Sequence, residues 1–353
     1  MQQLIKVLTP LFLIIIYIIF SSLYNEKIEL VNGYPIWMKN AEGFFSRQTS
    51  GLFFLGKEGS KKYFLSANDN GRIERISIDE SFNPPVFNVI KLTNKLSTVN
   101  EFLRHLGKWD YEEIVYDKVT DKILVSMEGN SGLNDLTPRE HKNFKELEGI
   151  YEFSFNKTIL DCDTLTELRK LSMPEIIFQY SNENVAIEGF ALTDNYYFAG
   201  LENLSDSLAQ FSDSTYLYIV DRKTNNVKII SSKLLNIRSI SALYAANDYT
   251  LYGVDRDSKQ IFYVRFNKDF TVNGVKSISY ELTLPLHDDI SLDLMAGAEA
   301  IAIDNEGYIY INLDPWSDLY KPDFTVKNFL TEEEKNNITM LVPVLYKYKN
   351  PFK

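Results

Sequence analysis

The sequence predicts an all-β fold, a six-bladed β-propeller in which five blades are clearly recognisable, preceded by an N-terminal segment of a different kind. Aromatic residues make up 14% of the chain, with 22 Tyr and 23 Phe. Short apolar runs alternate with clusters of Asn, Asp, Gly and Ser, which favours strands over helices. A hairpin pattern also recurs along the chain at intervals of about 50 to 75 residues, as in repeat architectures.

The clearest hairpin is GAEAIAIDNEGYIYINLDP, residues 297–315. Two alternating apolar runs flank an Asp-Asn-Glu-Gly turn, which is a strong hairpin signal. Counting back by two from Ile303 places Glu299 on the apolar face of the first strand. The pattern therefore predicts a carboxylate at a buried position near the start of that strand.

Four other hairpins share this pattern, an acid and then alternating apolar positions. They start at Glu42, Glu112, Glu188 and Ser241, where serine replaces the acid. The second strand of each hairpin ends in an acid, and these acids are Glu128, Glu202, Asp255 and Asp314, with Asp69 one place late. A third strand follows in most copies, and units of three or four antiparallel strands at this period are typical of propeller blades.

Strand-like runs near residues 86–92 and 160–184 are expected to complete a sixth blade. Rings of five or seven blades are alternatives within the same architecture. A large β-sandwich or two unrelated β domains would also contain many short strands. We expect a single propeller domain over residues 30–353.

Residues 1–24 differ from the rest of the chain. Lys6 precedes ten unbroken apolar residues, 11–20, and the chain turns polar at residues 25–27. This is short for a membrane span of about 20 residues, and it fits a signal peptide or an uncleaved N-terminal anchor. We expect an exported protein, periplasmic or extracellular, that meets the membrane only through this segment and is a monomer.

Composition excludes several classes of site. The net charge is −11, and no cluster of Lys and Arg offers the basic footprint that nucleic acids require. Cys162 is the single cysteine, so an internal disulfide is excluded, and the three histidines stand far apart in sequence. A zinc site built from Cys and His is therefore not expected.

Hairpin geometry brings the start of one strand beside the end of the next. The acids should therefore meet in pairs around one mouth of the central channel: Glu299 with Asp314, Glu188 with Glu202, and Glu112 with Glu128. Close carboxylates raise one another's pKa unless a cation neutralises them. An all-oxygen ligand set favours Ca²⁺, with Mg²⁺ or Mn²⁺ next. The alternative is that each acid only accepts backbone N–H groups and closes its blade.

Three passages resemble a known family: NENVAIEGFAL (182–192), preceded by LRKLSMPE; YDKVTDKILVSMEGN (116–130); and AEAIAIDNEGYIYINLDP (298–315). They are similar to motifs of the phytase-like propeller family, also called the esterase-like activity of phytase family, and the SdiA-regulated propellers share the general pattern. The resemblance covers roughly residues 35–349. It implies a six-bladed exported propeller with calcium on its acidic channel face and a phosphoester or ester hydrolase activity.

Matched position by position, the family's acids fall on Glu42, Glu112, Glu128, Glu188, Glu202, Glu299 and Asp314. Asp69 and Asp255 stand at corresponding strand ends and complete the expected calcium ligands. Ser241 departs from the pattern, so the ring of acids is incomplete. The cations near the motif ends are Arg72 and Arg256, which we expect to bind substrate.

Two functions fit these features. The first is a calcium-dependent hydrolase of a small phosphoester, without a serine nucleophile, because no Gly-x-Ser-x-Gly motif is present. The second is a non-catalytic propeller, stabilised by calcium, that binds a ligand or a protein. In either case the polar insertion 131–148 is expected to overhang the mouth.

Overall fold

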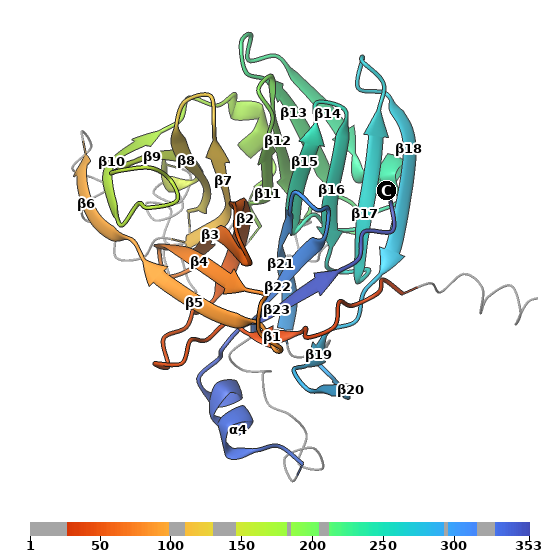
Figure 1. Cartoon of the computed structure of the whole chain (residues 1–353). Coiled ribbons are helices and arrows are strands. Elements are labelled where there is room, and N and C mark those ends of the chain that lie inside the picture. Colours follow the sequence, from red (N-terminus) through yellow and green to blue (C-terminus); the bar gives the residue numbers. More distant parts are fainter. Residues whose placement is uncertain are drawn as a thin grey trace, which may run out of the picture.

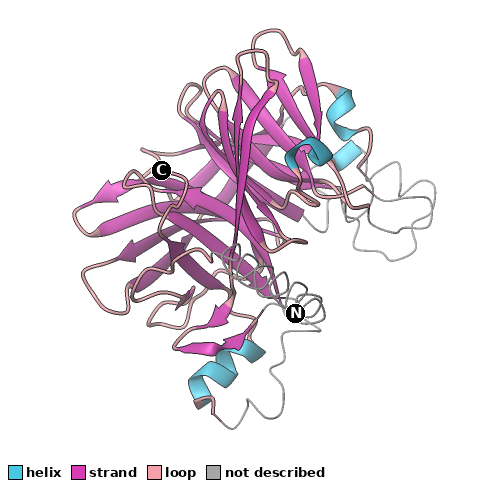
Figure 2. Ribbon diagram, turned by 90° about the vertical axis from the view of Figure 1, so that its right-hand side faces the viewer, coloured by secondary structure: helices cyan, strands magenta, loops and turns pink. Residues whose placement is uncertain are grey.

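The computed structural model describes residues 27–98, 110–129, 146–181, 185–204, 212–292, 296–315 and 329–353. Their strands form five sheets of four or five strands and one two-stranded sheet. The large sheets are arranged around a common centre, with the helices at the periphery (Figures 1 and 2). The prediction of a β-propeller is confirmed, with five blades among the described residues.

Each blade runs from an inner strand to an outer edge. Blade 1 contains β2 (Thr49–Glu58), β3 (Lys61–Asn68), β4 (Arg72–Asp79) and β5 (Val86–Lys91). Blade 2 contains β7 (Asp110–Asp117), β8 (Lys122–Glu128), β9 (Gly149–Phe155), β10 (Thr164–Lys170) and, outermost, β6 (Thr93–Thr98). Blade 3 contains β11 (Ile187–Leu192), β12 (Tyr196–Leu201), β13 (Tyr216–Asp221) and β14 (Val227–Ser231).

The other two blades follow the same order. Blade 4 contains β15 (Ala242–Asn247), β16 (Thr250–Asp255), β17 (Gln260–Phe266) and β18 (Val272–Ser279). Blade 5 contains β21 (Ala296–Ile303), β22 (Ile309–Pro315), β23 (Val344–Tyr348) and β1 (Ile36–Trp37). The short elements are β19 (Thr283–Leu284), β20 (His287–Ser291), η2 (Glu175–Phe178), η3 (Ser232–Leu235) and α4 (Glu332–Thr339).

The inner strands contact one another in the order β2, β7, β11, β15, β21 and back to β2, so the ring is closed. The last blade takes its outer strand from the beginning of the domain. Ile36 pairs with Leu345 and Trp37 with Val344, which joins the two ends of the domain in one sheet. Closure in this way removes the open edge that a linear row of blades would leave.

The segments expected to form a sixth blade contribute strands to blades 1 and 2. Val86–Lys91 is β5, the outer strand of blade 1, and Thr164–Lys170 is β10 in blade 2. Both extend blades that were already recognised from their hairpins. The five blades described here therefore account for these runs without a further sheet.

Successive side chains of an inner strand point to opposite faces and fill the core on both sides of the blade. In β21, Ile301 and Ile303 pack into one apolar cluster with residues of blade 4. Ala300 and Ala302 face a second cluster with residues of blade 1. A propeller strand is buried on both faces, so large residues on one side and small ones on the other set the spacing between neighbouring blades.

The first blade begins later than the sequence pattern predicts. Its inner strand is Thr49–Glu58, whereas Glu42 lies exposed in a turn. Gly43 has a φ of +86°, and the Asn40 side chain accepts a hydrogen bond from the Phe44 amide at 2.8 Å. These local contacts hold residues 40–44 in a turn, and the longer apolar run that follows takes the inner position.

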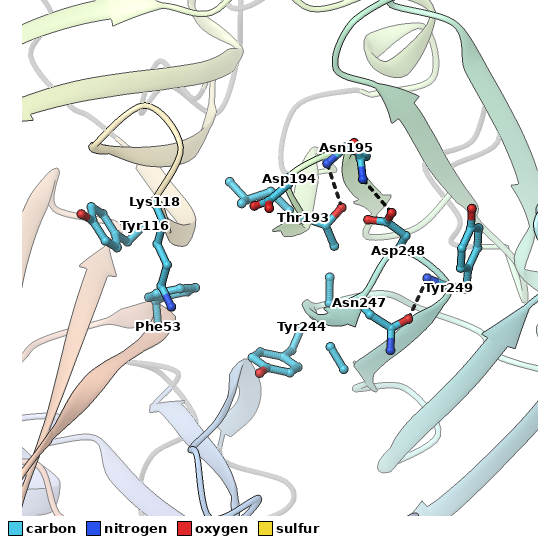
Figure 3. Close-up of a pocket in the computed structure, with 13 residues that line it drawn as sticks. Phe53, Tyr116, Lys118, Thr193, Asp194, Asn195, Tyr244, Asn247, Asp248 and Tyr249 are labelled. Atoms are coloured by element: carbon cyan, nitrogen blue, oxygen red, sulfur yellow. Dashed lines mark hydrogen bonds between the residues drawn. The ribbon is translucent and has the colours of Figure 1, made fainter.

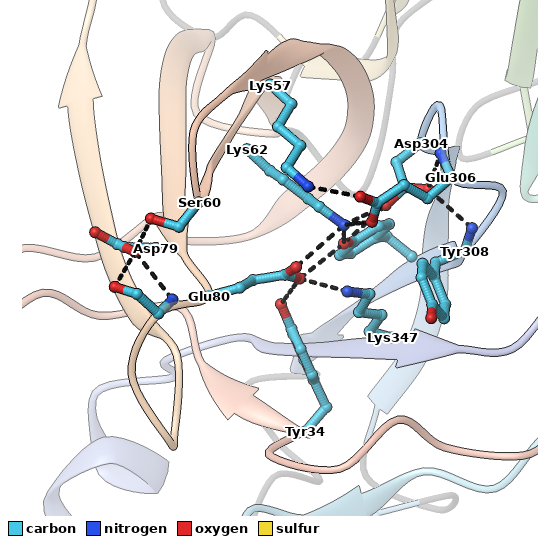
Figure 4. Close-up of polar contacts among 12 residues, drawn as sticks. Tyr34, Lys57, Ser60, Lys62, Asp79, Glu80, Asp304, Glu306, Tyr308 and Lys347 are labelled. Carbon is cyan, nitrogen blue, oxygen red and sulfur yellow. Dashed lines mark hydrogen bonds and ion pairs between the residues drawn. The ribbon is translucent and has the colours of Figure 1, made fainter.

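A buried ion network joins blade 1 to blade 5, and we call it the seam (Figure 4). The Lys62 ammonium lies 2.5 Å from Asp304, 2.9 Å from Glu306 and 3.1 Å from Glu80. Lys347 of β23 binds Glu80 at 2.5 Å. The Lys62 and Asp304 side chains are fully buried, so the network links the two blades that close the ring.

Helix α4 starts at a capping box, in which Thr331 and Glu334 each satisfy the other's backbone amide. Within the described ranges, no helix combines the length and apolarity that a membrane crossing requires. The predicted segment 1–24 lies outside the described residues, as does most of the insertion 131–148.

Candidate functional site

The acids reach the channel mouth because the inner strands bulge there. In β21 the pairing with β22 steps from Ala298 to Ala300 and leaves Glu299 unpaired. The same step leaves out Glu188 in β11, and Glu112 and Glu113 in β7. A bulge re-aims the side chain of the extra residue. An acid on an otherwise apolar strand can thus turn away from the core between the blades.

Blade 2 contributes the tightest group of carboxylates. Asp110, Glu112 and Glu128 each place one oxygen within 4.8 Å of the others, and all three residues are buried. Glu128 lies directly opposite Asp110 in the pairing of β7 with β8. Asp110 was not among the predicted ligands, although its position two residues before Glu112 in WDYEE was a usable signal.

Burial and mutual repulsion shape the electrostatics of this group. Burial raises the pKa of Glu112 and of Glu128 well above the usual range, and the charge of Glu188 adds to the effect. Asp110 raises the pKa of both groups further. The charged forms are therefore disfavoured unless a cation is nearby.

The acids of blades 3 and 5 surround Arg256, which follows β16 of blade 4. The Arg256 guanidinium binds Glu299 and Glu202 through separate nitrogens. Burial, and then Glu299, raise the pKa of Glu188 to about 8, while Arg256 opposes the rise. Burial also raises the pKa of Asp314 well above its ordinary value, with Asp69 and Glu299 adding to it. Arg256 is thus part of the acidic ring and is already paired with carboxylates.

Several buried oxygens at the mouth have no donor among the described residues. Glu128 Oε1, Glu299 Oε2 and Asp314 Oδ1 make no hydrogen bond within the part of the chain that the structure describes. Their residues are 7%, 6% and 8% exposed. Buried carboxylate oxygens normally find a donor or a cation, so these three are the oxygens of the mouth that a cation would satisfy.

The remaining predicted residues have different surroundings. Asp69 is half-buried, accepts a hydrogen bond from the Ser50 hydroxyl, and contributes to the raised pKa of Glu112 and Asp314. Asp255 turns away and accepts hydrogen bonds from Arg238 N at 2.8 Å, Ser239 Oγ at 3.0 Å and Ser258 N at 3.0 Å. Glu42 and Arg72 are exposed on blade 1, outside the group of buried acids.

Glu113, beside Glu112, has a structural role that the sequence did not reveal. Its Oε1 accepts the Leu52 amide at 3.2 Å and the Ile114 amide at 3.1 Å, and its Oε2 accepts the Leu243 amide at 3.5 Å. One carboxylate thereby joins the inner strands β2, β7 and β15. The backbone-capping alternative therefore describes Glu113 and Asp255, whereas the unpartnered oxygens of the mouth acids do not fit it.

The donor set at Asp110, Glu112 and Glu128 fits a hard divalent cation. Two oxygens bound to one Ca²⁺ at about 2.4 Å cannot lie more than about 4.8 Å apart. The three carboxylates meet this limit, and they contain no nitrogen or sulfur ligand. The charge of Glu299 raises the pKa of both Glu188 and Asp314, so further carboxylate oxygens lie near.

A cavity of about 620 Å³ lies among the hairpin turns at the other ends of the inner strands (Figure 3). Aromatic side chains line it, among them Phe53, Tyr116 and Tyr244, together with polar groups of the turns 193–195 and 247–249. Asn195 donates to Asp248 at 2.8 Å and links blades 3 and 4 there. None of the buried mouth acids lines this cavity, so it is distinct from the acidic mouth.

No protein-family model and no curated protein matches this chain. Solved structures with a similar arrangement include a luciferin-regenerating enzyme, with a TM-score of 0.44 and 11% identity over 90% of this chain and 96% of that one. A PQQ-bound aldose sugar dehydrogenase from Streptomyces coelicolor gives 0.44 and 8% over 91% and 98%. A GH43 β-1,3-galactosidase gives 0.41 and 10% over 80% and 90%. Likeness at this level says nothing about the activity of this chain.

Proposed function

We propose that the acidic channel mouth binds Ca²⁺ and that the protein engages its ligand through that ion. The observation that carries this proposal is the group of Asp110, Glu112 and Glu128, three buried carboxylates with oxygens within 4.8 Å of one another. Glu128 Oε1 has no donor among the described residues, which leaves it available for a cation. Capping of the blade alone would not explain such an oxygen.

In this proposal, Asp110, Glu112 and Glu128 hold the ion, and the bulge in β7 keeps Glu112 turned toward it. Bound Ca²⁺ would neutralise repelling carboxylates and would give a phosphoester oxygen a Lewis-acidic partner. Glu113 fixes the position of β7 through its hydrogen bonds to β2 and β15. The ligands are thereby positioned by rigid strands.

The activity we propose is hydrolysis of a small phosphoester, in line with the resemblance to the phytase-like propellers. An anionic substrate entering this mouth would otherwise face several carboxylates. Arg256 is engaged by Glu202 and Glu299, and Arg72 lies outside the buried acids. The ion is therefore the expected contact for a phosphate group.

The second candidate is a propeller that binds a ligand without turnover and uses calcium for stability. The pairing of Arg256 favours this function, because no unpaired cation is present at the described part of the mouth to help orient a phosphate. Export and a monomeric state belong to both proposals. A calcium site of modest affinity would suit an extracellular or periplasmic location, where a dissociation constant of about 10⁻⁴ to 10⁻³ M is sufficient.

The decisive experiment is a calorimetric titration of the full chain with Ca²⁺ after removal of divalent ions. We expect heat of binding in the wild type and none in Asp110→Asn/Glu128→Gln. Asp117→Asn is the matched control, because Asp117 lies at the opposite end of β7 and pairs with Arg222. Equal binding by wild type and the double variant would exclude this site.

A second assay separates the two functions. We expect the chain to hydrolyse p-nitrophenyl phosphate or phytate in Ca²⁺ and to lose this activity in EGTA. Absence of turnover, together with a rise in melting temperature on adding Ca²⁺, would favour the binding module. The double variant Asp110→Asn/Glu128→Gln should lose both the turnover and the rise in melting temperature.

A further inference from the structure

Blade 4 differs from blades 2, 3 and 5 at the channel mouth. The position where blades 2, 3 and 5 carry an acid is Ser241, whose hydroxyl donates to the Ala298 carbonyl at 2.9 Å. At the end of its second strand, Asp255 turns outward to cap a loop, and the next residue, Arg256, enters the mouth. Neighbouring residues of a strand point in opposite directions, so this one-residue offset exchanges an acid for a cation.

The surroundings of the Arg256 side chain match its shape and its charge. Its two terminal nitrogens bind carboxylates from two different blades, Glu202 after β12 and Glu299 in β21. Gly297 leaves room for it, since a Cβ there would lie 2.8 Å from Arg256 Cδ and 2.3 Å from Glu299 Oε1. A planar guanidinium is well suited to hold two carboxylates at once.

Arg256 divides the mouth into two halves. The half of blade 2 holds Asp110, Glu112 and Glu128, whose oxygens lie within 4.8 Å of one another. The other half holds Glu202, Glu299 and Asp314 near Arg256. Glu299 Oε2 and Asp314 Oδ1 in this half still lack a donor among the described residues. The guanidinium of Arg256 therefore satisfies some of the carboxylate oxygens in this half and leaves these two without a partner there.

We propose that Arg256 takes the place of a second divalent cation, so that the mouth holds one ion fewer than its carboxylates could bind. The identity of the first site rests on the proposed function, but the role of Arg256 concerns the other half of the mouth. Removing the guanidinium leaves Glu202, Glu299 and Asp314 without their counter-ion. A hard cation is then the simplest neutralising group.

The test counts Ca²⁺ ions by calorimetry in the full chain, stripped of divalent ions, for wild type and Arg256→Gln. We expect Arg256→Gln to bind one ion more per chain than the wild type. Arg256→Lys keeps the charge and should bind as many ions as the wild type. The triple variant Arg256→Gln/Glu202→Gln/Glu299→Gln should lose the additional ion, because its carboxylates are gone.

Arg222→Gln is the matched control, since Arg222 is also a partly buried arginine paired with a carboxylate, Asp117, away from the acidic mouth. It should leave the number of ions unchanged. An equal count in wild type and Arg256→Gln overturns the inference, whatever that count is. No ion in the wild type and one in Arg256→Gln would refute the proposed function while supporting the role of Arg256.

A second variant applies if Arg256→Gln does not fold. Glu202→Gln/Glu299→Gln keeps Arg256 but removes the charges that neutralise it. The freed cation should then repel Ca²⁺ from the neighbouring half and weaken binding there at least tenfold. An unchanged dissociation constant would show that the charge of Arg256 does not act on the mouth.

Discussion

The channel mouth and the seam are both clusters of buried charge, and they balance that charge in opposite ways. With Lys57, which binds Glu306 at its edge, the seam sets three lysines against three acids: Lys57, Lys62 and Lys347 against Glu80, Asp304 and Glu306. Within the described residues, the mouth sets one arginine, Arg256, against eight acids: Asp69, Asp110, Glu112, Glu128, Glu188, Glu202, Glu299 and Asp314. Among the described residues, cations and acids balance in the seam, whereas acids are in excess at the mouth.

The titration behaviour of the two regions follows from this difference. Hydrogen bonds from Lys57 and Lys62 lower the pKa of Glu306 to about 2. At the mouth, burial and like charges raise the pKa of Glu188 to about 8. A balanced cluster therefore stabilises the fold by itself, and an unbalanced one stores repulsion that a ligand can relieve.

The largest effect is expected from Lys62→Met, which removes the central cation of the seam. Asp304 would keep a fully buried charge without its counter-ion, while Glu80 would still have Lys347. Breaking a buried pair in this way costs about 3–5 kcal/mol. Urea unfolding should show this loss of stability. A loss below about 1 kcal/mol would mean that the seam is not what holds blades 1 and 5 together.

The pH dependence of the melting temperature, measured without calcium, should report on the acids of the mouth. The pKa of Glu188 is about 8 in the folded protein, against an ordinary value of 4.5. Between these two pH values, Glu188 holds a proton in the folded chain that it has released in the unfolded chain. Stability therefore falls as the pH rises through this window, and we expect the melting temperature to drop by on the order of 5 °C. Saturating Ca²⁺ should reduce the drop, and a melting temperature that rises with pH in EGTA would contradict this account.

Glu128→Gln should have the opposite sign to the seam variant. An amide at this position removes one of several repelling charges, so the calcium-free protein should gain on the order of 1 kcal/mol. The stabilisation by Ca²⁺ should disappear in the same variant. Thermal melting with and without Ca²⁺ measures both effects, and destabilisation of the calcium-free form would argue that Glu128 is a structural cap.

The smallest effect is expected from Lys57→Met, the control for Lys62→Met. Lys57 binds Glu306 at 2.6 Å, but both side chains are partly exposed, at 32% and 40%. Exposed pairs contribute about 0–1 kcal/mol, so urea unfolding should change little. A cost as large as that of Lys62→Met would show that the whole seam behaves as one unit.

The sequence predicted those features that depend on local periodicity. Alternation and turn residues located the hairpins, and Glu112 and Glu128 lie together as the hairpin geometry indicated. Glu299 and Asp314 likewise influence each other's charge. These outcomes need only the two-residue period of a strand and the antiparallel return of its partner.

Other features depend on strand pairing and could not be found by counting residues. The bulge decides that Glu112 faces the mouth while Glu113 binds three inner strands. A one-residue offset sends Asp255 outward and Arg256 inward. Lys62 pairs with Asp304, which is 242 positions away in the sequence, and no local sequence pattern predicts this pair.

The short strand β1 has a consequence for the order of events during synthesis. Ile36 and Trp37 pair with Leu345 and Val344 of the fifth blade, which follow much later in the chain. The polypeptide must therefore emerge from the ribosome at least as far as these two residues before the ring can close. Such distant pairing also slows folding, because a very long loop must be closed first. If the chain is exported by threading, it can cross the membrane before this last pairing locks it.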